Sequence, residues 1–218
     1  MTFGGIILCG GQSQRMGLDK ASLPFGDETM LARVARRLFQ VVSPIVVVAA
    51  RNQSLPEIGV PYVVAHDARE SQGPLEGLAA GMAALENEVD AVYATSCDVP
   101  LLEPDFVRRM TQLLGEHEIV VPKEEKFYHP LAAVYRTSVL VKIECLLDHG
   151  RLRPRFLFDG CDTREVEVEK LREVDAELNT LMNLNRPEDY LRVAKLAGVE
   201  VPPDVVSVLG IDGEINGS

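Results

Sequence analysis

The fold is first visible in GGIILCGGQSQRMGLDK, residues 4–20. Its first part, Gly4–Cys9, is a short apolar run without a polar face, which is typical of a parallel strand covered on both sides. Consecutive glycines after such a strand let backbone N–H groups approach phosphate oxygens, because no Cβ obstructs them. Arg15 and Lys20 add positive charge. The stretch therefore predicts a buried strand followed by an anion-binding loop.

Two familiar phosphate-binding loops do not fit these glycines. A P-loop needs G-x-x-x-x-G-K-[ST], whereas two residues separate Gly17 from Lys20. A dinucleotide fingerprint needs G-x-G-x-x-G, and Gly10, Gly11 and Gly17 do not have that spacing. The loop therefore belongs to another class of anion site.

Apolar runs of strand length alternate with amphipathic stretches of helix length in the first half of the chain. The predicted strands are Gly4–Cys9, Ile45–Ala50, Tyr62–Ala65 and Ala91–Thr95. The predicted helices are Glu28–Val41, Leu75–Leu85 and Pro104–Leu114. This order predicts an α/β fold with a Rossmann-like, doubly wound sheet, whose ligands bind outside the carboxyl ends of the strands.

The second half has a different pattern, for which we expect mixed strand directions. Its predicted elements are strands over Glu118–Pro122, Tyr128–Tyr135 and Thr163–Val168 and a helix over Ser138–Leu147. No repeat or linker divides the chain, so we expect a single domain over residues 1–201. Residues 202–218, which contain two prolines and three glycines, are expected to form a loosely attached C-terminal tail.

Composition narrows the classes of protein. A hydrophobic content of 46% and a charged content of 25% are ordinary for a soluble globular domain. The net charge of −11 argues against binding to nucleic acid or to anionic membranes. The four cysteines form no C-x-x-C pair, so zinc-ligand spacing is absent. Because we find no leader and no apolar run near 18 residues, we expect a cytoplasmic protein.

The glycine-rich loop resembles the signature LAGGxSxRMGxDK of molybdenum cofactor guanylyltransferases. These are MobA-like nucleotidyltransferases with the nucleotide-diphospho-sugar transferase fold, a GT-A-like mixed sheet. Further matches follow in the same order: Asp67, Gly73–Gly77, Cys97–Pro100, His129–Leu131 and Asn183–Asp189. The resemblance spans roughly residues 4–195.

The resemblance implies transfer of GMP from GTP to the molybdopterin cofactor, with release of pyrophosphate and a requirement for Mg²⁺. The nucleotide-binding residues that it implies are Leu8, Cys9, Gly10, Gly11, Ser13, Arg15, Lys20, Asp67, Gly73 and Asp98. Among these, Arg15, Lys20 and Asp98 are the expected catalytic residues. Asp98 follows a predicted buried strand and offers the hard carboxylate that Mg²⁺ prefers, so it is the expected metal ligand.

The pterin substrate is expected to contact a second set of residues. Arg151 and Arg153, in the densest basic cluster of this acidic chain, match the arginine segment that the family uses near the pterin. Asn183 and Asn185 precede a predicted helix and either cap it or face the substrate. His129 either faces the cleft or has a structural role.

One departure from the family pattern leaves the base open. The family often has an asparagine after its second strand to read guanine, where this chain has Ala50 and Arg51. A CTP-using molybdopterin cytidylyltransferase, a sugar-phosphate nucleotidyltransferase and a non-catalytic GTP-binding or cofactor-delivery module therefore remain alternatives. The presence of both Lys20 and Asp98 argues against the last. The family role also predicts transient contact with molybdoenzyme-maturation proteins.

Overall fold

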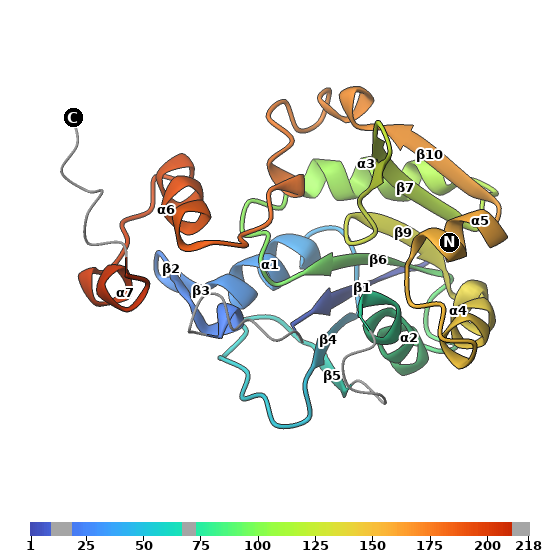
Figure 1. Ribbon diagram of the computed structural model, residues 1–218, viewed down its shortest axis with the longest axis horizontal. Helices are drawn as coiled ribbons and strands as arrows, with labels where there is room; N and C mark the ends of the chain where they lie inside the picture. The colour runs from blue at the N-terminus through green and yellow to red at the C-terminus, as the bar shows by residue number, and fades with distance from the viewer. Residues whose placement is uncertain (10–18, 67–72, 211–218) are drawn as a thin grey trace.

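The computed structural model describes residues 1–9, 19–66 and 73–210 (Figure 1). The strands of its main sheet are β1 Phe3–Leu8, β4 Ile45–Ala49, β5 Val63–His66, β6 Ala91–Ser96, β7 Ile119–Glu124, β8 Phe127–Tyr128, β9 Ala133–Arg136 and β10 Thr163–Glu167. Within the described residues these eight strands run in the order β10-β7-β9-β6-β1-β4-β5, with β8 paired to β7. A separate ribbon pairs β2 (Pro24–Phe25) with β3 (Glu28–Thr29).

Helices cover both faces of the sheet (Figure 1). They are α1 Met30–Phe39, α2 Pro74–Ala84, α3 Pro104–Leu114, α4 Leu140–Asp148, α5 Arg155–Gly160, α6 Pro187–Leu196 and α7 Pro203–Val208. Helices α1 and α3 share one core cluster with Ile7, whereas α2, α4 and α5 share the opposite cluster with Ile6. Both isoleucines are fully buried, because β1 is an internal strand covered by helices on both faces. The predicted doubly wound fold is confirmed.

The strands next to β1 bring three loops to one edge of the sheet. β1 pairs in parallel with β4 on one side and with β6 on the other. Gly5 lets helix α1 pack closely against β1, because a Cβ at this position would lie 2.7 Å from a side-chain carbon of Leu38 in α1. The carboxyl ends of β1, β4 and β6 therefore lie together, where an open parallel sheet binds its ligands.

The second half of the sheet is mixed, as expected. β9 runs antiparallel to both β6 and β7, whereas β10 is parallel to β7. The predicted single strand Tyr128–Tyr135 is wrong, since β8 and β9 are separated by a turn in which Ala132 N–H donates to the His129 carbonyl at 3.1 Å. Pro130 has no N–H for a ladder, which favours this interruption.

The start of α1 and the burial of β5 also differ from the sequence prediction. The helix predicted from Glu28 begins at Met30, because Glu28 and Thr29 form β3 and the Thr29 hydroxyl caps α1. The strand β5 was expected to be covered on both faces, yet Val63 and Val64 are 47% and 42% exposed. β5 is the edge strand of the described sheet, so its burial is incomplete.

Residues 203–209 are not the loosely attached tail that was expected. They form α7 and its C-cap, and Val205, Val206 and Leu209 are buried in a third cluster with Leu23 and Tyr190. In Figure 1 this cluster, which joins α6 and α7 to the β2–β3 ribbon, lies at one end of the molecule. Residues 211–218 lie outside the described part, and the single domain over residues 1–201 stays a prediction. The described helices are too short or too polar to cross a membrane.

Candidate active site

The predicted nucleotide site divides into a described and an undescribed part. Five of its residues lie outside the described residues: Gly10, Gly11, Ser13, Arg15 and Asp67. Among the others, Leu8, Cys9, Lys20 and Asp98 lie where β1 and β6 end, whereas Gly73 lies at the start of α2. The geometry of the site is therefore built from Lys20, Asp98 and their neighbours.

Lys20 and Asp98 meet across 78 positions of sequence. Lys20 Nζ lies 3.0 Å from Asp98 Oδ2, and only 14% and 16% of the two side chains are exposed. Lys20 begins a short 3-10 helix, Lys20–Ser22, which Asp19 caps by accepting a hydrogen bond from Ala21 N–H at 3.1 Å. The structure thus brings together the two residues that were predicted to bind phosphate and metal.

Asp98 is held from two sides. The Ser96 hydroxyl donates to Asp98 Oδ1 at 2.5 Å, and Leu184 N–H donates to the Asp98 carbonyl oxygen at 3.0 Å. Ser96 is buried at the end of β6. Sequence reasoning missed it, although its place in the strand before the Cys97–Pro100 motif was a usable signal. The Ser96 contact holds one carboxylate oxygen of Asp98, the Leu184 contact holds its backbone, and the second carboxylate oxygen faces Lys20.

The backbone of Leu8 and Cys9 forms part of the same edge. The Leu8 carbonyl accepts from Cys97 N–H at 3.1 Å, and Cys9 N–H donates to the Val48 carbonyl at 2.8 Å. The Cys9 and Cys97 side chains are buried in the same core cluster. A hydrogen bond with Cys97 and burial both raise the pKa of the Cys9 thiol, so this cysteine is a packed core residue rather than a nucleophile.

Gln53 connects the loop after β4 to this edge, and sequence reasoning missed it. Its Nε2 lies 3.4 Å from the Cys9 carbonyl and 3.0 Å from Asp19 Oδ1, and its Oε1 accepts from Ala50 N–H at 3.2 Å. The only signal in the sequence was its position in a polar segment after a strand. Gln53 therefore links the Cys9 carbonyl to the carboxylate of Asp19, the residue before Lys20.

Gly73 caps the helix α2. Its φ of 77° is unfavourable for residues with a Cβ, and Pro74 follows at the first helical position. A helix that starts in this way presents free N–H groups and the positive end of its dipole. Gly73 borders the undescribed residues 67–72, so its role toward the nucleotide stays a prediction.

The segment with Asn183 and Asn185 lies next to Asp98. Leu184 between them is fully buried and donates to Asp98, whereas both asparagines are exposed. The start of α6 is capped by the Asp189 carboxylate, which accepts from the N–H groups of Asn185 and Arg186 at 3.1 Å each. Within the described residues, no hydrogen bond joins either asparagine side chain to the start of α6, so the predicted capping role has no support there, and their role toward the substrate stays a prediction.

Arg151, Arg153 and His129 are not joined to this cluster. The Arg151 guanidinium lies 4.1 Å from the ring centroid of Phe156, and within the described residues no ion pair or hydrogen bond connects either arginine to Lys20 or Asp98. Burial lowers the pKa of His129, and its Nε2 has no hydrogen-bond partner among the described residues. The roles of all three stay predictions.

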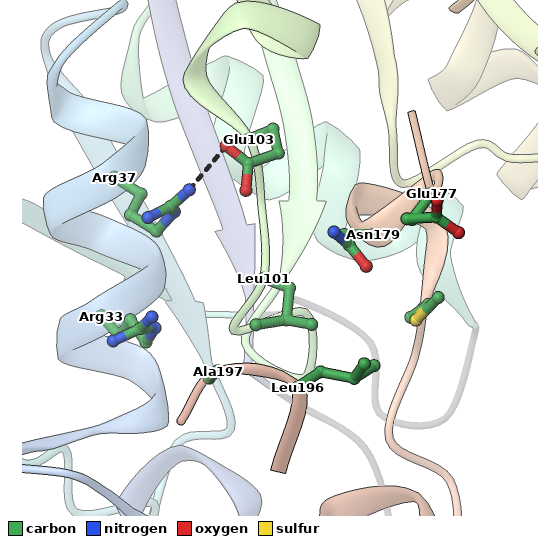
Figure 2. Close-up of a pocket in the computed structure, with 9 residues that line it drawn as sticks. Arg33, Arg37, Leu101, Glu103, Glu177, Asn179, Leu196 and Ala197 are labelled. Carbon is green, nitrogen blue, oxygen red and sulfur yellow. Dashed lines mark hydrogen bonds and ion pairs between the residues drawn. The ribbon is translucent and has the colours of Figure 1, made fainter. Parts of the chain in front are cut away.

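The cavity shown in Figure 2 is not the predicted site. It has a volume of about 400 Å³ and is lined by Arg33, Arg37, Leu101, Glu103, Glu177, Asn179, Met182, Leu196 and Ala197. Its guanidinium groups are already paired, since Arg37 binds Glu103 at 2.8 Å and Arg33 binds Glu28 at 3.3 Å and the Pro100 carbonyl at 2.9 Å. The cavity therefore offers little unpaired positive charge to an anionic ligand.

A metal could be held at Asp98 by a single protein carboxylate. In the described parts of the chain, no group of three or more His, Cys, Asp or Glu side chains is arranged to hold a metal ion. Mg²⁺ is commonly bound through one or two carboxylates together with substrate phosphates and water. Asp98 could bind Mg²⁺ in this way, as one carboxylate ligand beside substrate phosphates and water.

The family model of the MobA-like NTP transferase domain matches residues 5–164, a stretch that contains Lys20, Gln53 and Asp98. The chain belongs to the MobA-like NTP transferase family. This confirms the family, and with it the nucleotidyltransferase class, to which the sequence motifs pointed. Lys20 and Asp98 both lie within the matched stretch, and their roles in nucleotide and metal binding stay predictions.

Individual proteins agree with this assignment. A "Probable molybdenum cofactor guanylyltransferase" of Mycobacterium avium is 37% identical over 201 residues, covering 89% of this chain and 96% of the relative. A protein of the same name from Methanosarcina mazei is 34% identical, covering 84% and 86%. The structure of molybdopterin-guanine dinucleotide biosynthesis protein A from Archaeoglobus fulgidus is similar in fold, with a TM-score of 0.73 and 20% identity over 89% of this chain and 98% of that one.

Proposed function

We propose that this chain is a molybdenum cofactor guanylyltransferase, which transfers GMP from GTP to the molybdopterin cofactor and releases pyrophosphate. The contact between Lys20 and Asp98 at the carboxyl edge of the sheet carries the proposal, because it joins a phosphate-binding cation to a metal-binding carboxylate. Relatives that cover most of this chain carry the name of that activity, which supports the choice of substrates.

The reaction needs alignment and charge stabilisation, and it needs no covalent enzyme intermediate. The terminal phosphate of the pterin attacks the α-phosphorus of GTP, a new P–O bond forms, and the bond to the leaving pyrophosphate breaks. Lys20 binds the phosphate oxygens as a mobile point charge and stabilises the charge that develops on pyrophosphate. Its place in a capped 3-10 turn keeps the ammonium at the edge of the sheet.

Asp98 is the residue that would hold Mg²⁺. When bound, the ion offsets the repulsion between the anionic nucleophile and the anionic triphosphate. Ser96 orients the carboxylate through its hydrogen bond to Oδ1, so Asp98 keeps one direction toward the substrate. Leu184, which lies between the exposed Asn183 and Asn185, donates its N–H to the Asp98 carbonyl, and this backbone contact supports the predicted role of the two asparagines at the pterin phosphate.

Two residues after β4 bear on which nucleobase the site prefers. The sequence has Ala50 where the family often has a guanine-reading asparagine, and the nearby Gln53 amide is engaged with Cys9 and Asp19. A CTP-using cytidylyltransferase is therefore the second candidate. Contact with molybdoenzyme-maturation proteins remains an expectation from the family role.

The test incubates the purified protein with molybdopterin cofactor, Mg²⁺ and either GTP or CTP. We expect pyrophosphate and a pterin–guanine dinucleotide with GTP, and neither product with CTP. Turnover with CTP alone would overturn the guanine assignment. Binding of GTP without turnover would favour a non-catalytic binding module, and turnover with a sugar phosphate in place of the pterin would favour a sugar-phosphate nucleotidyltransferase.

A further inference from the structure

Gln53 is the one described side chain for which hydrogen bonds are found to both the Cys9 backbone and the residue that precedes Lys20. It comes from the loop after β4, 44 residues after Cys9 and 34 residues after Asp19. Its amide contacts Cys9 O at 3.4 Å, Asp19 Oδ1 at 3.0 Å and Asp19 Oδ2 at 3.2 Å. Its oxygen accepts a hydrogen bond from Ala50 N–H, so the amide nitrogen faces acceptors and the amide oxygen faces a donor.

The contact with Asp19 is the important one for catalysis. The Asp19 carboxylate already accepts from Ala21 N–H and so fixes the 3-10 turn that carries Lys20. The Gln53 amide supplies a further donor to this anion, and Lys20 is left to extend toward Asp98. Without Gln53, Asp19 would lose that donor and would become a competing partner for the neighbouring ammonium.

We propose that Gln53 is a positioning residue of the nucleotide site, which acts through Asp19 on Lys20 and through the Cys9 carbonyl on the backbone after β1. This inference rests on the proposed nucleotidyl transfer. It adds a residue from the loop after β4, which the motifs in the sequence did not mark. Its hydrogen bonds form where the ends of β1 and β4 come together, so they depend on the parallel pairing of these strands.

The first test replaces Gln53 with leucine, which keeps the size of the side chain and removes its hydrogen bonds. Loss of a hydrogen bond to a charged group predicts a fall in kcat/KM for the nucleotide of roughly tenfold. We expect the change mostly in KM for the nucleotide, with KM for the pterin unchanged. Gln112→Leu, on the exposed face of α3, is the matched control and should leave both constants unchanged.

The second test replaces the hydrogen-bond donor of Gln53 with an acceptor. Gln53→Glu places a carboxylate against Asp19 and should impair nucleotide use more than leucine does. Adding Asp19→Asn restores a donor opposite the acceptor, and asparagine still caps the turn. The double variant should therefore recover several-fold in kcat/KM over Gln53→Glu alone. A purely structural role would instead lower the melting temperature and raise both KM values.

Two results would overturn the inference: wild-type kinetics in Gln53→Leu, or effects of the two substitutions that simply multiply. Calorimetric titration with GTP and with CTP accompanies the kinetics. If the wild-type chain binds nucleotide without transferring it to the pterin, the proposed function fails. The inference is then decided separately, since Gln53→Leu should still bind nucleotide roughly tenfold more weakly.

Discussion

The two halves of the main sheet differ in the side-chain contacts at the carboxyl ends of their strands. Where β1, β4 and β6 end, polar side chains from distant parts of the chain contact one another, as Lys20 does Asp98 and Gln53 does Asp19. Where β7 and β10 end, the charged contact is between Lys123 and Glu165, and 40% of the Glu165 side chain is exposed. The Lys20–Asp98 pair is more sheltered from solvent than the Lys123–Glu165 pair.

This difference follows from the direction of the strands. Three parallel neighbours bring three loops to one edge, so side chains from separate loops converge there. In the second half, the antiparallel β9 lies between β6 and β7 and sends its own carboxyl end to the opposite edge. The candidate site joins side chains from segments that follow three parallel strands, whereas the contacts of Glu165 come from the neighbouring strands themselves.

The largest expected effect comes from Asp98→Asn. The variant keeps the size of the side chain and an oxygen for Ser96, but it loses the charge that faces Lys20 and that would hold Mg²⁺. We expect turnover to fall by roughly 10³-fold, because both charge stabilisation and metal binding are impaired. Steady-state pyrophosphate release measures the loss, and circular dichroism checks that the fold is intact.

The control for this variant is Asp105→Asn. Asp105 lies in the first turn of α3, its side chain is 70% exposed, and it forms an ion pair with Arg108. Its substitution should leave turnover unchanged. Unchanged turnover in Asp98→Asn as well would remove Asp98 from the mechanism.

Much of the fold could be predicted from the sequence, because buried parallel strands have a strong pattern. Ile6 and Ile7 face opposite core clusters, as a strand without a polar face requires. The short helix α7 was not predicted, because two prolines and nearby glycines hid a buried face that only the third cluster explains. The position of β5 at the edge was also hidden, since its composition resembles that of an internal strand.

The candidate site was predicted in part for a related reason. Lys20 and Asp98 stand in recognisable motifs, so each could be assigned a role before their contact was known. Gln53 stands in no such motif, and its importance depends on the pairing of β4 with β1. Pairings between distant strands are not encoded in local residue patterns, which is why the motif residues were found and the residue that supports them was not.

A smaller effect is expected from the double variant Arg151→Ala with Arg153→Ala. If these arginines bind the pterin phosphate, losing their charge-assisted hydrogen bonds should raise KM for the pterin roughly tenfold. KM for GTP should stay unchanged, because neither arginine contacts the described nucleotide residues. Arg108→Ala with Arg109→Ala on α3 is the matched control for lost charge. A raised KM for GTP would reassign the Arg151 segment to the nucleotide.

The smallest effect is expected at the exposed pair. Glu165 accepts hydrogen bonds from Lys123 and from the Tyr128 hydroxyl, and these lower its pKa. Because the folded-state pKa is below the unfolded-state value, this stabilisation is present above the unfolded pKa and is lost as the pH falls through the folded pKa. An exposed pair contributes less than about 1 kcal/mol, so Glu165→Gln should lower the free energy of unfolding at pH 7 by no more than that.

Urea unfolding at several pH values tests this expectation. The difference between Glu165→Gln and the wild type should shrink toward acidic pH, because the carboxyl group is then protonated in both states of the wild-type chain. Turnover should stay at the wild-type level, since Glu165 lies outside the cluster around Asp98. A difference that grows on acidification would contradict the stabilising role of the Glu165 contacts. A loss of turnover like that of Asp98→Asn would show that the ends of β7 and β10 contribute to the site.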